Sequence, residues 1–542
     1  MSESAKAEGE TAWAAEWRDA LGRYWRVELY VIAVLLFVAG FSLPFADPDL
    51  PIHLATGEWI AKHHAVPFVE PFAWTRPGAP FLAYSWAIEL AYYEVMAHVG
   101  PLGLSALQGL VYVALAGVML VLGRAAGWNP WVIILMAAAN LIVALGAAPY
   151  LRPQSILLLA VPLTWGLVYR SLDTKRLWAT LGGLFVIGVV LANTHLLFPV
   201  MAAPCVLLLG RMPEQRSRIL LVPLAIVAGW LVSPYTTHLV EMFRLYFAPN
   251  PLIGPPSGIN EYKPGFLMML TAGNSSLAIA ALLTVAPWFV AARIDAKNRA
   301  LFGVLWLGGL LMFALAVRSL IVWWVVAIPI ASALFSLFPP PTVPVVKTAQ
   351  RAIVPVIFAA VAAAGLETWL DPTLLPGNAS MRYLPSTNAK SIESLALWID
   401  CNTRRVPGRL VTMFNYGGYI PWRLPYLSES IDGRTFFPDS VAKPETYFSP
   451  YKGKLQLQPW RTADLAIFPV AFPIATVLDT AKGWHRVAMT SELEGPARMI
   501  AVWVTDRWWA TAGRSHLPRS VLPVMHSLEP RRATCESLVV SR

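Results

Sequence analysis

The sequence predicts a polytopic α-helical membrane protein with an α/β soluble domain at its C-terminal end. Of its 542 residues, 56% are hydrophobic and only 14% are charged, which is typical of chains that cross a membrane many times. Apolar segments of membrane length follow one another up to residue 370, and none follows later. We therefore divide the chain into a transmembrane domain, residues 1–370, and a soluble domain, residues 371–542.

The apolar segments give about eleven predicted membrane-spanning helices. Lys and Arg occur mainly in alternate loops, so the positive-inside rule places the N-terminus in the cytoplasm and the C-terminal domain outside. This scattered distribution argues against a nucleic-acid partner despite the net charge of +10, because a phosphate backbone requires a clustered basic stripe. Residues 177–210 can also form one broken helix pair, with the break at 193–195. The predicted spans are 26–45, 101–123, 129–147, 153–170, 177–193, 196–210, 218–236, 269–292, 299–317, 319–338 and 351–370.

The first outer loop, residues 46–100, contains the strongest candidate for a functional site. Asp47 and Asp49 come directly after the first span, and His53 follows them on a short amphipathic stretch. Two carboxylates with one intervening residue can share a divalent cation such as Mg²⁺ or Mn²⁺, or act as a general base and its orienting partner. The alternative is a plain polar turn, since Asp-Pro is ordinary turn chemistry.

Residues 81–98 of the same loop are rich in aromatic side chains but also carry Glu89 and Glu94. Trp and Tyr at this spacing favour the headgroup layer, so the segment predicts an interfacial helix rather than a span. A lipid-linked substrate would arrive at that layer. The alternative is a helix that only roofs the bundle, with Trp86 and Tyr92 as anchors.

Further polar residues gather on the outer side of the predicted bundle. Ionisable groups at membrane ends are often plain anchors, but their accumulation on one face predicts a substrate site. Arg152 or Arg318 would supply the positive charge that a phosphate group needs. The substrate-binding candidates are His53, Arg152, His195, Glu261 and Arg318.

The soluble domain reads as a mixture of helix and strand. We predict a helix near 387–400, strands near 408–413, 464–470, 485–490 and 498–504, and a tight glycine loop at 414–419. Cys401 and Cys535 both fall in this domain, and two cysteines in an oxidising compartment predict a disulfide. The third cysteine, Cys205, lies inside a predicted span.

Several enzyme classes lack their signatures in this chain. It has no Gly-rich loop followed by Lys and Ser or Thr, no G-x-S-x-G elbow and no HExxH helix. Inverted repeats and charges buried within spans, which transporters use, are not evident. A membrane enzyme is therefore favoured over a nucleotide hydrolase or a transporter.

The first outer loop resembles that of bacterial proteins in the GT-C glycosyltransferase superfamily, which carry Asp-x-Asp, two aromatics, His-Leu-x-x-Gly and later Asp-Pro-Phe-Ser-Trp-Thr. The matching runs are residues 47–57 and 67–75, with Pro51 and Ile52 in place of the aromatics and Glu70 in place of the later Asp. Shorter landmarks of the same group are Arg152-Pro153-Gln154, Asn193-Thr194-His195, Gly417-Gly418-Tyr419 and Asp432-Gly433-Arg434.

The resemblance implies a GT-C-like membrane protein of the bacterial inner membrane that transfers a sugar from a polyprenyl-phosphate carrier on the periplasmic face. The acceptor would be a lipid or a glycan, with an Asp of the first outer loop as base or metal ligand. Oligosaccharyltransferase catalytic subunits carry Trp-Trp-Asp-Tyr-Gly, whereas residues 413–417 here read Met-Phe-Asn-Tyr-Gly. Without that acidic residue, N-glycosylation of protein is not predicted.

A non-catalytic protein of the same architecture is the alternative. It would bind a polyprenyl or glycan and act as an assembly or export factor, with the bilayer as its other partner. Replacing Asp47 or Asp49 by Asn separates the two hypotheses, because the change removes a charge and keeps the shape. The sequence names no protein partner.

Overall fold

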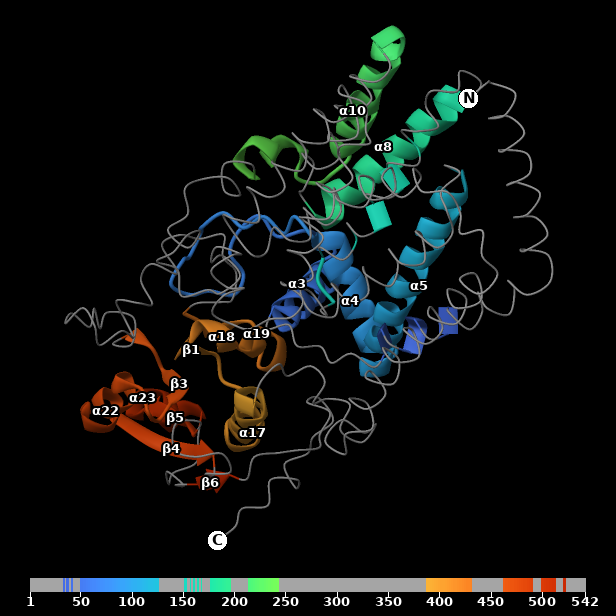
Figure 1. The fold of residues 1–542 in the computed structure, drawn as a ribbon. Coiled ribbons are helices and arrows are strands. Elements are labelled where there is room, and N and C mark those ends of the chain that lie inside the picture. Colours follow the sequence, from blue (N-terminus) through green and yellow to red (C-terminus); the bar gives the residue numbers. More distant parts are fainter. Residues whose placement is uncertain are drawn as a thin grey trace, which may run out of the picture.

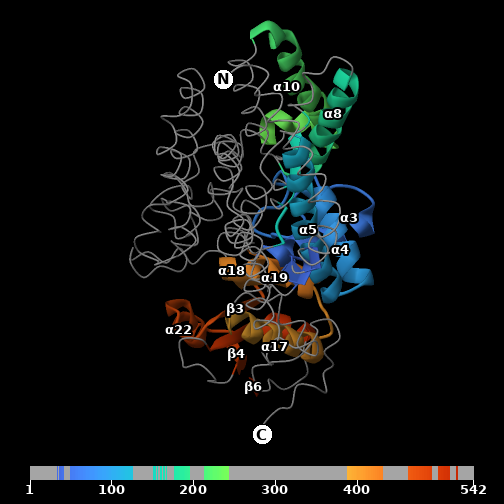
Figure 2. The same ribbon diagram turned by 45° about the vertical axis from the view of Figure 1, so that its right-hand side comes forward.

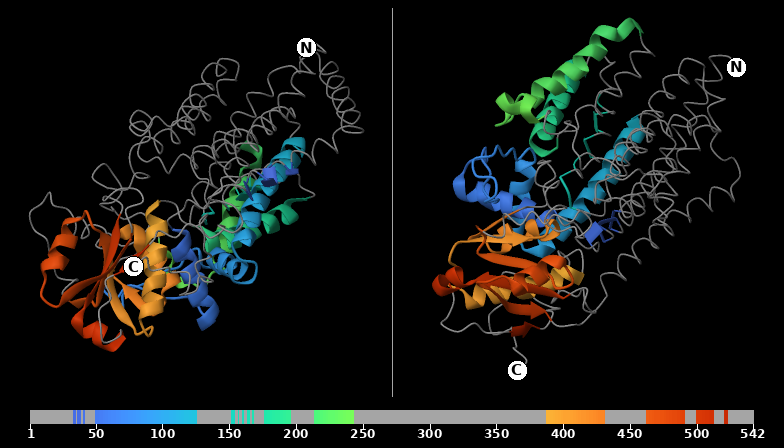
Figure 3. Two further views of the ribbon diagram at one scale, coloured as in Figure 1. Left: turned by 90° about the horizontal axis from the view of Figure 1, so that it is seen from below. Right: turned by 90° about the vertical axis from the view of Figure 1, so that its left-hand side faces the viewer.

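The computed structural model describes residues 49–125, 176–195, 213–242, 387–430, 462–490, 499–512 and 520–522, together with parts of 33–41 and 151–167. Within these residues the molecule has three successive parts (Figure 1). Helices α8 (Leu177–Thr194) and α10 (Arg216–Trp230) lie at one end, helices α3 (Leu50–His63) and α4 (Trp86–His98) lie in the middle, and a β-sheet lies at the other end. Figure 2 and the right-hand view of Figure 3 show the same order from other directions.

The first outer loop folds into two helices, α3 and α4, that pack against each other. Helix α3 has a proline in its first turn and ends at His63, and the next residue, His64, adopts a left-handed conformation with φ of 50°. Helix α4 lies within the stretch for which the sequence predicts an interfacial helix. With 13 residues it is about 20 Å long and too short to span a bilayer. Gly100, with φ of 77°, then turns the chain into helix α5 (Pro101–Ala125).

Helix α8 is, within the described part of the chain, the helix that is long and apolar enough to cross a membrane. It packs closely against α10 at two glycines, Gly188 and Gly229. A side chain at either position would collide with the backbone of the other helix. The predicted span 218–236 ends earlier, at Trp230, since Pro234 cannot continue a helix. The spans predicted at 129–147, 196–210, 269–292, 299–317, 319–338 and 351–370 lie outside the described residues, so the number of spans stays a prediction.

The C-terminal part contains a six-stranded mixed sheet in the order β2-β1-β3-β5-β4-β6. Strand β1 pairs in parallel with β2 and β3, β5 is antiparallel to β3 and β4, and β4 pairs in parallel with β6. Helix α17 (Thr387–Asn402) and the four long strands confirm the predicted elements. The strands are β1 (Gly408–Thr412), β2 (Leu427–Glu429), β3 (Leu465–Pro469), β4 (Trp484–Thr490), β5 (Ile500–Thr505) and β6 (Ser520–Leu522), with helices α22 (Pro473–Thr480) and α23 (Asp506–Ala512) between them.

The predicted glycine loop at 414–419 is wrong. Two short helices occupy this segment, α18 (Phe414–Gly417) and α19 (Tyr419–Arg423). Gly418 has φ of −73°, an ordinary helical value, so the glycine serves neither a left-handed turn nor a loop. The segment is buried instead: Ile420 and Trp422 of α19 belong to the same hydrophobic core as Leu50 and Leu54 of α3. The sheet part and the first outer loop therefore share one core.

A second contact fixes the first outer loop to the sheet, through residues 70–75. Ala73 forms a parallel bridge with Glu429 of β2, in which Trp74 N donates to Glu429 O at 3.0 Å and Glu429 N donates to Phe72 O at 3.1 Å. Trp74 Nε1 also donates to Leu410 O of β1 at 3.1 Å. The Glu70 carboxylate accepts hydrogen bonds from the amides of residues 72 and 73, at 2.9 and 3.1 Å. The second run that carries the family resemblance thus has a structural role as a short edge strand.

Cys401, near the end of α17, is disulfide-bonded, and its partner lies outside the described residues. The pairing with Cys535 stays a prediction. We expect peptide mass mapping under non-reducing conditions to recover a cross-linked peptide that contains both cysteines. A free Cys535 thiol in protein taken from membranes would contradict it.

Candidate active site at the start of helix α3

Asp49 lies directly before helix α3 and faces an arginine. Its side chain makes no capping hydrogen bond to the helix. One carboxylate oxygen instead lies 3.5 Å from Nη2 of Arg152. Both side chains keep some exposure, 31% for Asp49 and 18% for Arg152, so a ligand can reach the pair. The polar-turn alternative for Asp49 does not account for this contact, which joins two predicted site residues.

His53 lies one helical turn further along α3, and its amide donates to Asp49 O at 3.1 Å. Its ring Nδ1 is 2.7 Å from Oε1 of Glu89 on α4. Ser85 Oγ donates to the same Glu89 oxygen at 3.0 Å. Residues four apart lie on one face of a helix, so Asp49 and His53 together form a polar edge on α3.

Gly57 explains how α3 and α4 come close enough for this contact. A Cβ at Gly57 would collide with the Glu89 carbonyl and lie 2.7 Å from Cβ of Tyr93. The glycine of the first sequence motif therefore serves the helix crossing that brings His53 to Glu89.

The start of α4 also contacts the end of α8. Trp86 Nε1 donates to Asn193 Oδ1 at 2.7 Å, and the Asn193 amide donates to Val189 O and Val232 O at 2.7 and 2.9 Å. His195, 1% exposed, packs its ring edge-on against Tyr84, with ring centroids 6.1 Å apart. Asn193 and His195 therefore contact Trp86 and Tyr84, the two neighbours of Ser85 in the chain.

Three predicted site residues, Asp47, Glu261 and Arg318, lie outside the described residues, and their roles stay predictions. Glu89 and Ser85 are site residues that the sequence analysis did not select. The signal for Glu89 was present, because a carboxylate within an apolar segment requires a polar partner.

Within the described residues, no three His, Cys, Asp or Glu side chains cluster in a way that could hold a metal ion. Asp49 faces a guanidinium, and Glu89 faces a histidine. The described donors alone therefore do not fit a divalent cation. A cation shared with Asp47 stays a proposal, and no step below runs through it.

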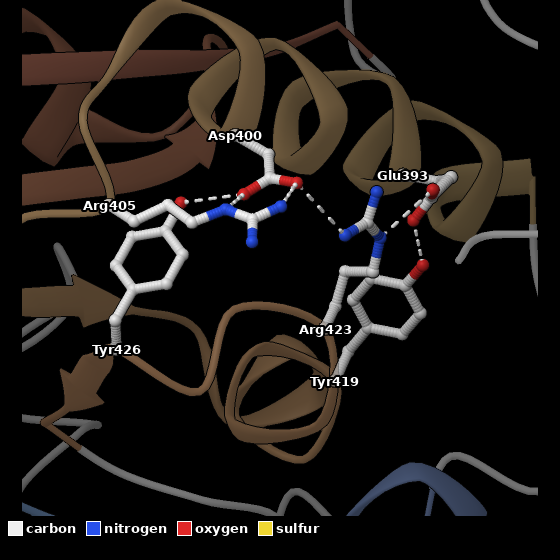
Figure 4. Close-up of polar contacts among 6 residues, drawn as sticks. All are labelled: Glu393, Asp400, Arg405, Tyr419, Arg423 and Tyr426. Atoms are coloured by element: carbon white, nitrogen blue, oxygen red, sulfur yellow. Dashed lines mark hydrogen bonds and ion pairs between the residues drawn. The ribbon is translucent and has the colours of Figure 1, made fainter. Parts of the chain in front are cut away.

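A network of charged side chains links α17 to α19, the helix that packs on α3 (Figure 4). Arg423 Nε donates to Glu393 Oε1 at 3.2 Å, and its Nη1 lies 3.8 Å from Asp400 Oδ2. The Tyr419 hydroxyl donates to the other Glu393 oxygen. Asp400 also accepts from Arg405 at 2.9 and 3.0 Å. The network joins α17 to α19, and α19 in turn packs on α3.

Burial raises the pKa of Glu393 to about 7, against the opposing effects of Arg423 and Tyr419. The folded state thus holds the Glu393 proton more tightly than the unfolded chain does. This contribution to stability is fully present below pH 4.5 and is lost as the pH rises through about 7. The rise of the Glu393 pKa from 4.5 to about 7 corresponds to about 3 kcal/mol in the free energy of unfolding. We expect Glu393→Gln, which stays neutral, to remove this pH dependence, as measured by hydrogen exchange of α17 after correction for intrinsic exchange rates. An unchanged slope would contradict the assignment.

No protein-family model matches the sequence, and no curated protein matches it. Solved structures do match the fold. The fold is similar to that of ArnT and to that of the oligosaccharyltransferase AglB.

Three similar structures, two of ArnT and one of AglB, illustrate the likeness. ArnT from Cupriavidus metallidurans, bound to undecaprenyl phosphate, is 13% identical, with a TM-score of 0.52 over 92% of this chain and 99% of ArnT. The archaeal oligosaccharyltransferase AglB from Archaeoglobus fulgidus, in complex with an inhibitory peptide and a dolichol-phosphate, is 9% identical, with a TM-score of 0.52 over 82% of this chain and 69% of AglB. The apo state of ArnT gives a TM-score of 0.50 at 16% identity, over 88% of this chain and 97% of ArnT.

Proposed function

We propose that this protein is a GT-C-type glycosyltransferase of the bacterial inner membrane. It takes a sugar from a polyprenyl-phosphate carrier and transfers it to a lipid or glycan acceptor on the periplasmic face. The observation that carries the proposal is the Asp49–Arg152 pair at the start of α3, 3.5 Å apart, in a chain with the GT-C fold. Two proteins with this fold are seen with undecaprenyl phosphate and dolichol-phosphate, which supports a lipid-phosphate ligand here.

The chemistry fits the charges at this edge. When the bond between the sugar and the phosphate breaks, negative charge develops on the leaving phosphate oxygen, and a fixed cation stabilises that charge. Arg152 is such a cation, and Asp49 holds its guanidinium in place. Asp47, Glu261 and Arg318 are proposed to complete the site. Asp47 and Asp49 would hold a divalent cation if one takes part, and that ion would neutralise phosphate charge.

Arg152→Gln tests the phosphate contact. We expect the variant to bind undecaprenyl phosphate at least about 10-fold more weakly than wild type, because a charge-assisted contact to the phosphate is lost. The measurement is binding by the full chain in nanodiscs, with Arg405→Gln as the control. That variant removes the same charge from an arginine with 69% side-chain exposure on the far side of α19.

Undecaprenol provides a second control, because it has the same tail and no phosphate. Equal affinity for undecaprenol and undecaprenyl phosphate, or equal affinity of wild type and Arg152→Gln, would contradict the proposal. Phosphate-dependent binding without sugar transfer from any donor would favour the non-catalytic alternative.

A further inference from the structure

The His53–Glu89 contact differs from an ordinary surface ion pair. The Glu89 side chain is 7% exposed and the His53 side chain 15%. Glu89 lies on a helix that Gly57 allows to pack tightly against α3, so the ring and the carboxylate cannot easily separate. Ser85 holds the same Glu89 oxygen from the start of α4. A second carboxylate–histidine pair on α4 provides a contrast. Glu94 and His98 lie 3.0 Å apart, and their side chains are 47% and 76% exposed.

A carboxylate oxygen cannot donate, so at 2.7 Å from Nδ1 the hydrogen bond requires a proton on Nδ1. In a neutral imidazole with its proton on Nδ1, the lone pair is on Nε2. Glu89 therefore selects the tautomer and the ring orientation of His53, as a carboxylate does for a catalytic histidine.

Asp49 and His53 have different neighbours. Asp49 lies 3.5 Å from the Arg152 guanidinium and so belongs to the phosphate-binding pair. His53 faces a carboxylate, which stabilises the positive charge that the ring gains with a proton. We propose that His53 Nε2 is the general base of the transfer reaction and that Glu89 is its positioning residue. This inference rests on the proposed function.

The step balances as follows. The acceptor hydroxyl oxygen forms a bond to the anomeric carbon of the donor sugar, and its proton moves to Nε2 of His53. The bond between the anomeric carbon and the phosphate oxygen breaks, and its electron pair leaves with that oxygen, toward Arg152. The products are the glycosylated acceptor, the free polyprenyl phosphate and an imidazolium, which then releases its proton to water. Asp49 and Arg152 thus serve the leaving group, and His53 and Glu89 serve the nucleophile.

The first test needs no substrate. Diethyl pyrocarbonate modifies an imidazole nitrogen that carries a lone pair, and peptide mass spectrometry of the full chain gives the rate at His53. Glu89→Gln keeps the shape but removes the charge and the obligatory acceptor, because the amide NH2 can face Nδ1 and then holds the ring proton on Nε2. We expect the modification rate of His53 to fall at least several-fold in this variant and to stay unchanged in the matched control Glu94→Gln. An unchanged rate at His53 in folded Glu89→Gln protein would overturn the positioning role.

The second test separates base catalysis from binding. We measure turnover of undecaprenyl-phosphate-linked hexoses and binding of undecaprenyl phosphate for wild type, His53→Gln, Glu89→Gln and the double variant. General base catalysis contributes about 10²–10⁴-fold, so we expect losses of that order in turnover with little change in undecaprenyl phosphate affinity. The double variant should be no slower than His53→Gln alone, because Glu89 acts through His53.

Independent, multiplicative losses in the double variant, or an equal loss of lipid affinity, would mean that Glu89 acts by general support of the fold, and the inference would be overturned. Glu89→Asp is the control for misfolding. It restores the charge on a shorter side chain and should recover part of the turnover that Glu89→Gln loses. The proposed function fails separately, if wild-type protein neither binds undecaprenyl phosphate nor turns over any of these donors.

Discussion

Asp49→Asn is expected to slow sugar transfer by at least about 100-fold, the size of effect seen when a group that stabilises transition-state charge is lost. The change keeps the shape of the side chain and removes the charge that holds Arg152. Arg152 would then no longer be fixed where the leaving phosphate develops its charge. The measurement is release of undecaprenyl phosphate from an undecaprenyl-phosphate-linked hexose by reconstituted protein.

Glu94→Gln is the control for this variant, because it removes the same charge from an exposed carboxylate of the same loop. It should leave the rate within about two-fold of wild type, since surface pairs of this kind contribute little. Full transfer activity of Asp49→Asn at normal expression would show that Asp49 does not serve the leaving phosphate.

Arg423→Leu is expected to destabilise the sheet part by about 3–5 kcal/mol, the range for removing one partner of a buried ion pair. Arg423 is 6% exposed at its side chain and is shared by Glu393 and Asp400. Without it, Glu393 and Asp400 lose the guanidinium that both contact, and burial then favours the protonated form of Glu393. We expect hydrogen exchange of α17, α19 and β1 to rise together, because the network joins the two helices that cover this region.

Arg405→Gln is the matched control, since it removes an arginine from the same Asp400 at an exposed position. Its effect should stay within about 1 kcal/mol. Equal destabilisation by the two variants would show that the burial of the Arg423 network is not what stabilises this region.

The elements of the C-terminal part could be predicted because their pattern is local. Strands β3 and β5 are runs of buried apolar residues, and α17 has helical periodicity. The prediction of a loop at 414–419 is wrong because two adjacent glycines usually mark a turn. There the packing of Ile420 and Trp422 against α3 overrides the local signal. Such a contact joins residues more than 350 positions apart, and no local pattern encodes it.

The candidate site could likewise be predicted from the sequence only in part. Asp49, His53 and Arg152 could be selected because charged groups at the end of an apolar segment stand out in a sequence. The structure brings two of these residues together, Asp49 and Arg152. Glu89 was visible as a charge in an apolar stretch, but its pairing with His53 depends on how closely α3 and α4 cross at Gly57. Helix crossing distance follows from packing in three dimensions and not from residue spacing.

The lipid that copurifies with the full chain tests the central claim most directly. Native mass spectrometry of protein released from bacterial membranes identifies bound lipids, with Arg152→Gln analysed in parallel. The account predicts undecaprenyl phosphate, or undecaprenyl phosphate carrying a sugar, on wild-type protein and much less of it on Arg152→Gln. Bulk phospholipid alone on both proteins, unchanged after undecaprenyl phosphate is added, would contradict it.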